Sequence, residues 1–105
     1  ATKIVDHSGK LILPTFIDSH IHFPQMHMIG RHGTHLLEWL DSYTFPEEIK
    51  FMNADFAAKS ADAFCKKLKK HGIGYAAVYG NSSAETFCQR CLGKIPRVRL
   101  YIKGV

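Results

Sequence analysis

The chain has no long hydrophobic run and few cysteines. No stretch of about 18 apolar residues occurs, so the sequence predicts no membrane-spanning helix and no membrane partner. The first residues, ATKIVDH, lack the charged start and apolar block of a signal peptide. The three cysteines, Cys65, Cys88 and Cys91, are too few and too unevenly spaced for a disulfide scaffold. These absences favour a cytoplasmic protein.

Positive charge is in excess, but its pattern does not favour nucleic-acid binding. The formal net charge is +5 with neutral histidines. Four lysines fall at the end of an expected helix, where cations complement the helix dipole and stay solvated. A nucleic-acid interface would want the charge on one face with aromatic side chains between. We therefore expect no nucleic-acid partner. The lysines are Lys66, Lys67, Lys69 and Lys70.

Hydrophobic patterning predicts alternating strands and helices. Residues 54–71 have the spacing of an amphipathic helix, with Asn53 as its N-cap and Gly72 just after its end. Residues 23–52 read mostly as a long loop that contains a short helix at 34–41, capped by Thr34. Pro46 is expected to stop this helix, and a second short turn is expected at 47–51. The order of elements implies parallel pairing. The other expected elements are short strands at 2–5 and 11–13 around a turn, strands at 16–22, 75–79 and 98–102, and a helix at 83–92.

The most informative motif is His20-Ile21-His22 at the end of the strand expected at 16–22. Side chains two apart on a strand point to the same side, so the two imidazoles lie together and can grip one metal ion. Asp18 shares this face. Its carboxylate either orients one of the histidines or satisfies backbone donors at the strand end.

The string PTFIDSHIH at 14–22 resembles the first barrel strand of the amidohydrolase superfamily. The segments FPQ at 23–25, LLEWL at 36–40 and YTFPEE at 43–48 are similar to those of its guanine deaminase family. The resemblance implies an α/β fold, the N-terminal fragment of a (β/α)8 barrel, because a whole barrel needs about 250 residues. Residues 1–13 would then end a flanking β-domain as a β-hairpin, and residues 14–105 would form the first barrel elements.

The same resemblance implies zinc-dependent hydrolysis of guanine to xanthine and ammonia. His20 and His22 match two metal ligands, and Gln25 matches a glutamine that contacts the purine. The other ligands and the proton-transferring carboxylate of the family come later in its barrel, so no residue here is assigned a catalytic role. Two ligands hold zinc poorly, and the isolated chain should therefore be a poor catalyst.

Several alternatives stay open at this point. Trp39 either stacks on the purine or anchors the expected short helix in the core, whereas Leu36 and Leu40 favour the core. The activity could belong to another amidohydrolase deaminase. The chain could instead be a non-catalytic piece that docks to a partner or self-associates as a homo-oligomer through open sheet edges. The sequence departs from the family's pattern in three places: Thr15 replaces a glycine, Gly72-Ile73-Gly74-Tyr75 stands where the family usually has Gly-Thr-Thr-Thr, and the tail after Gly80 resembles no substrate-binding segment.

Overall fold

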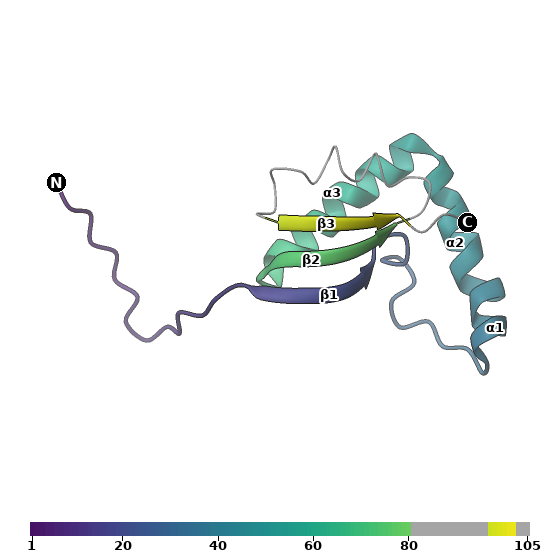
Figure 1. The fold of residues 1–105 in the computed structure, drawn as a ribbon, viewed down its shortest axis with the longest axis horizontal. Helices are drawn as coiled ribbons and strands as arrows, with labels where there is room; N and C mark the ends of the chain where they lie inside the picture. Colours follow the sequence, from purple (N-terminus) through teal and green to yellow (C-terminus); the bar gives the residue numbers. More distant parts are fainter. Residues whose placement is uncertain (81–96, 103–105) are drawn as a thin grey trace.

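A computed structural model describes residues 1–80 and 97–102, which form a parallel three-stranded sheet with a long helix against one face (Figure 1). The strands lie in the order β1-β2-β3, and both neighbouring pairs are parallel, as the order of elements predicts. The elements are β1 (Phe16–His22), α1 (Leu36–Trp39), η1 (Leu40–Thr44), α2 (Phe45–Ile49), η2 (Lys50–Met52), α3 (Ala54–Lys70), β2 (Ile73–Gly80) and β3 (Arg97–Ile102).

Helix α3 begins and ends where its capping residues predict. The side chain of Asn53 accepts a hydrogen bond from the backbone N–H of Phe56 at 3.0 Å. At the other end Gly72 has a φ of +70°, a conformation that glycine adopts without steric cost. In the part of the chain that the structure describes, no helix is long and apolar enough to cross a membrane.

The core lies between α3 and the inner face of β2. Ala76 and Val78 alternate along β2 and are buried against the helix. The buried stripe of α3 has the spacing expected of an amphipathic helix, and Phe56 and Ala63 pack beside it half-buried. Cys65 is buried in this core and is disulfide-bonded, which the cysteine count did not predict. The stripe consists of Ala57, Ser60, Ala61, Phe64, Cys65 and Leu68.

The two short helical segments expected within 23–52 are present, but the break expected between them at Pro46 is wrong. From Leu36 to Met52 the backbone is helical without interruption, passing from α1 through the π-helix η1 into α2 and the 3-10 turn η2. Pro46 does not break it, because it lies in the first turn of α2, where its missing N–H costs little. Thr34 does not cap this helix, which begins after His35.

The hairpin expected in residues 1–13 is also wrong. The turn forms, with the backbone N–H of Lys10 donating to the carbonyl of His7 at 3.0 Å. Its two arms do not pair, and the segment extends away from the sheet (Figure 1). A lone two-stranded hairpin is marginal without a sheet or helix to pack on, and Leu11 and Ile12 are 88% and 80% exposed.

Candidate metal centre and ligand pocket

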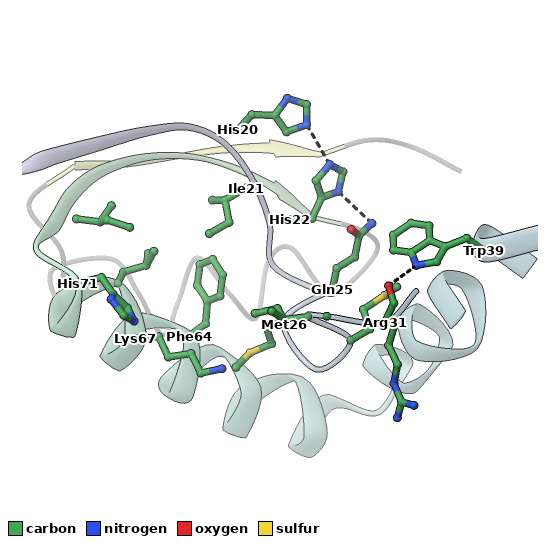
Figure 2. A pocket seen from close by; sticks show the side chains of 15 residues that line it. His20, Ile21, His22, Gln25, Met26, Arg31, Trp39, Phe64, Lys67 and His71 are labelled. Carbon is green, nitrogen blue, oxygen red and sulfur yellow. Dashed lines mark hydrogen bonds between the residues drawn. The ribbon is translucent and has the colours of Figure 1, made fainter. Parts of the chain in front are cut away.

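The two histidines of β1 converge as the strand period predicts. The Nε2 atoms of His20 and His22 are 3.0 Å apart, and their ring planes are inclined by 28° (Figure 2). Zinc binds imidazole nitrogen at about 2.0–2.1 Å. Two Nε2 atoms this close can therefore both reach one ion, and the pair fits half of a metal site.

An irregularity in β1 includes the first histidine of this pair. The pairing of β1 with β2 shifts register between Asp18 and Ile21. Such bulges re-aim the side chains that follow. The backbone N–H of His20 donates to Oδ1 of Asp18 at 3.0 Å. Asp18 thus takes the second of its two expected roles, satisfying a backbone donor.

An aromatic ring from the neighbouring strand supports the pair. Tyr79 of β2 is in register with His22, and its ring stacks on both imidazoles, with centroids 4.3 Å from His20 and 5.1 Å from His22. Sequence analysis placed a strand over Tyr79 but gave it no role at the site. The expected parallel pairing could have indicated this role, because parallel strands end at the same edge of a sheet, which places the end of β2 beside the histidines.

Gln25 lies beside His22. The chain turns sharply after β1: Phe23 is fully buried, and its backbone N–H donates to the carbonyl of Tyr79 at 3.0 Å. This turn brings Nε2 of Gln25 to 3.4 Å from Nδ1 of His22. The same Nε2 donates to Oε1 of Glu48 at 3.3 Å. Nothing in the sequence pairs Gln25 with Glu48, which is 23 residues away.

One cavity of about 480 Å³ joins the predicted site residues. His20, His22, Gln25 and Trp39 all line it, and Figure 2 shows Gln25 between His22 and Trp39. The indole N–H of Trp39 donates to the carbonyl of Arg31 at 3.1 Å. Trp39 is half-buried and stands apart from the apolar core found in the described residues. This placement favours the pocket over the core as the location of Trp39. The expectation that Leu36 lies in the core is wrong, because Leu36 is exposed.

The remaining polar residues of the loop do not complete the site. Nε2 of His27 lies 3.0 Å from Oγ of Ser60, on the side of α3. Among residues 1–80 and 97–102, no group of three or more His, Cys, Asp or Glu side chains could hold a metal ion. Catalytic zinc sites have three protein ligands and an open position. The described residues thus offer a histidine pair, His20 and His22, with no third candidate ligand grouped with it.

Comparison with known proteins identifies the family. The pattern of the Amidohydrolase family matches residues 11–105. The chain belongs to the amidohydrolase family. The guanine deaminase of Escherichia coli is 42% identical over 78 residues, which are 74% of this chain and 18% of that protein. A probable guanine deaminase of Deinococcus radiodurans is 42% identical over 82 residues, 78% of this chain and 19% of that protein.

Solved structures agree with this assignment. The crystal structure of guanine deaminase from C. acetobutylicum, with guanine bound in its active site, superimposes with a TM-score of 0.74 at 32% identity. The match covers 85% of this chain and 22% of that one. This amidohydrolase chain thus spans about a fifth of the length of the relatives it matches. The α/β fold agrees with theirs.

Proposed function

We propose that this chain forms the first part of a zinc-dependent guanine deaminase. The observation that carries the proposal is the convergence of His20 and His22 beside Gln25 in one cavity. The relatives that match the chain are guanine deaminases, and the fold of the matched part is the same. The substrate would be guanine, and the products xanthine and ammonia.

Each site residue has a distinct part in this proposal. His20 and His22 would hold zinc through Nε2, and zinc when bound supplies hydroxide by lowering the pKa of water to about 7. Gln25 would hydrogen-bond the purine edge, since its amide carries both donors and an acceptor. Trp39 would stack on the flat face of the base. Further ligands and the proton-transferring carboxylate would come from outside the described residues.

The architecture we propose is an incomplete (β/α)8 barrel over residues 14–105, with residues 1–13 belonging to a flanking β-domain. The order β1, helix, β2 and the parallel sheet support it. Within the described residues β1 has a partner on one edge only, and Phe16 and Ile17 are exposed. An open edge with apolar neighbours favours pairing with another chain. We therefore expect the isolated chain to be inactive and to self-associate.

Two alternatives to this proposal remain, another deaminase activity and a non-catalytic role. A related deaminase would use the same His20 and His22 with a different ring, and turnover of a purine panel separates it from guanine chemistry. A non-catalytic chain would keep the histidines without needing a base in the cavity. The presence of Gln25 and Trp39 on the cavity wall favours guanine over both.

We also propose a cytoplasmic location, which the sequence composition supports. The disulfide at Cys65 counts against it, because cytosolic thiols are kept reduced. Titration of free thiols in the chain purified from cytosolic extract shows whether Cys65 is reduced, as a cytoplasmic location requires, or disulfide-bonded.

A segment exchange tests the function most directly. The 78 matched residues of the Escherichia coli relative are replaced by the corresponding residues of this chain, and guanine turnover is followed as ammonia release with zinc present. We expect turnover in the hybrid enzyme and none from the isolated chain. Turnover must disappear when His20 and His22 are changed to alanine. A folded, zinc-loaded hybrid that is inactive on guanine would overturn the proposal.

A further inference from the structure

We propose that Glu48 is a positioning residue that fixes the orientation of the Gln25 amide and so sets which chemical group of a ligand can bind there. The inference deepens the proposed function, on which the identity of the ligand rests. The contact between Glu48 and Gln25 itself does not depend on that identity. It joins the end of β1 to α2 across 23 residues of sequence.

The chemistry of Glu48 decides which end of the amide faces it. Oε1 of Glu48 lies 3.3 Å from Nε2 of Gln25. A carboxylate accepts hydrogen bonds but cannot donate them, whereas an amide has a donating NH2 end and an accepting carbonyl end. Only the NH2 end can therefore bond to Glu48. Both side chains are half-buried, so water competes less for this contact than at an exposed site.

The second contact of Gln25 uses the same nitrogen. Nε2 lies 3.4 Å from Nδ1 of His22, so the NH2 group sits between His22 and Glu48. Among the described residues Oε1 of Gln25 accepts no hydrogen bond, and Gln25 lines the cavity. The carbonyl oxygen is thus the end left for a ligand. A ligand must then offer an N–H, from an amino group or a protonated ring nitrogen, which guanine has.

The adjacent Glu47 provides a matched control. It lies on the same helix, α2, and forms an ion pair with Lys50 at 2.6 Å. Among the residues that the structure describes, Glu47 bonds to Lys50 rather than to Gln25 or His22, and it does not line the cavity. Changing Glu47 or Glu48 to glutamine removes the same charge from the same short helix. Only the change at position 48 removes the obligatory acceptor beside Gln25.

The first test reads the amide directly, without any ligand. The side-chain NH2 protons of Gln25 are followed by 15N NMR in the 105-residue chain, in wild type and in the Glu48→Gln, Glu48→Ala and Glu47→Gln variants. We expect both Glu48 variants to shift the Gln25 resonances and speed their exchange with water, and Glu47→Gln to leave them unchanged. Equal effects from both glutamates, or none from Glu48→Ala, would overturn the proposal.

The second test reads ligand choice. Guanine is compared with unsubstituted purine, which lacks the amino group and the N1–H donor. In wild type we expect a preference for guanine, and Glu48→Gln should lower that preference about three- to tenfold, since one hydrogen bond contributes about 0.5–1.5 kcal/mol. Glu47→Gln should keep it. If wild type binds neither base while only the Glu48 variants move the Gln25 resonances, positioning by Glu48 stands and the guanine proposal fails.

Discussion

The side chain of Thr15 occupies the space that a side chain at Gly74 would need. A Cβ atom built at Gly74 would overlap Oγ1 of Thr15 and lie 2.7 Å from its Cγ2. Oγ1 of Thr15 also donates to the carbonyl of Gly72 at 2.7 Å. Both positions are among those at which the sequence departs from the family's pattern. The larger residue on one strand entry is matched by the smaller residue on the next, so β1 and β2 still pair.

We predict that substitutions at Thr15 and Gly74 have coupled effects on the free energy of unfolding. Gly74→Ala should lower the free energy of unfolding by about 1–3 kcal/mol, because overpacking displaces Thr15. The same change in a Thr15→Gly background should cost less, since the space is then free. Urea denaturation of the four proteins of this cycle measures the coupling. Strictly additive effects would show that the two residues act independently.

Phe23 links the ligand loop to the core, and its loss should be expensive. Its ring is fully buried and packs edge-on against Phe51 and Phe64, with centroids 5.0 Å and 5.6 Å away. Phe23→Ala should cost about 3–5 kcal/mol of stability. Ile29→Ala on the same loop should change stability by less than about 0.5 kcal/mol, because Ile29 is 77% exposed. Chemical denaturation distinguishes the two variants, and equal losses would contradict this packing.

The stack of Tyr79 on the histidine pair should restrain the imidazoles for metal binding. Tyr79→Ala should weaken zinc affinity about two- to tenfold, because an aromatic pair contributes about 0.5–1.5 kcal/mol. Tyr79→Phe keeps the ring and should retain the affinity. Tyr75→Ala, on the same strand but at its other end, is the control. Calorimetric zinc titration measures all four chains, and a wild-type affinity for Tyr79→Ala would refute the restraint.

Trp39 should report on a bound base, because it is the only tryptophan in the chain. It lines the cavity with Gln25, so guanine stacked on the indole should quench its fluorescence. Gln25→Ala should raise the guanine concentration that gives half-maximal quenching about three- to tenfold, as expected for one lost hydrogen bond of about 0.5–1.5 kcal/mol. Half-maximal quenching at the same guanine concentration in both proteins would show that Gln25 does not contact guanine.

Local signals in the sequence predicted the regular elements well. Asn53 and Gly72 marked the ends of α3, and alternation marked β1 and β3. Two short helical segments were expected between Thr34 and Phe51, but their continuity was missed because Pro46 was expected to end the first one. A proline in the first turn of a helix is tolerated. The hairpin at 1–13 was expected from β-rich runs, but those runs have no sheet to join among the described residues.

The sequence predicted only part of the candidate site. His20, His22 and Gln25 lie within six residues of sequence, and both the strand period and the resemblance pointed to them. Glu48 and Tyr79 reach the site from α2 and β2, and only the tertiary fold brings them there. The predicted helix at 83–92 lies outside the described residues, so it stays a prediction.

The measurement that tests the central claim most directly is a zinc titration of the chain, followed by the imidazole 15N resonances of all seven histidines. The account predicts that zinc first shifts the Nε2 resonances of His20 and His22 together. It also predicts that alanine at either position weakens binding, whereas His27→Ala, away from the pair, does not. Zinc that shifts other histidines first, or binds equally well to the His20→Ala and His22→Ala variants, would contradict the metal site.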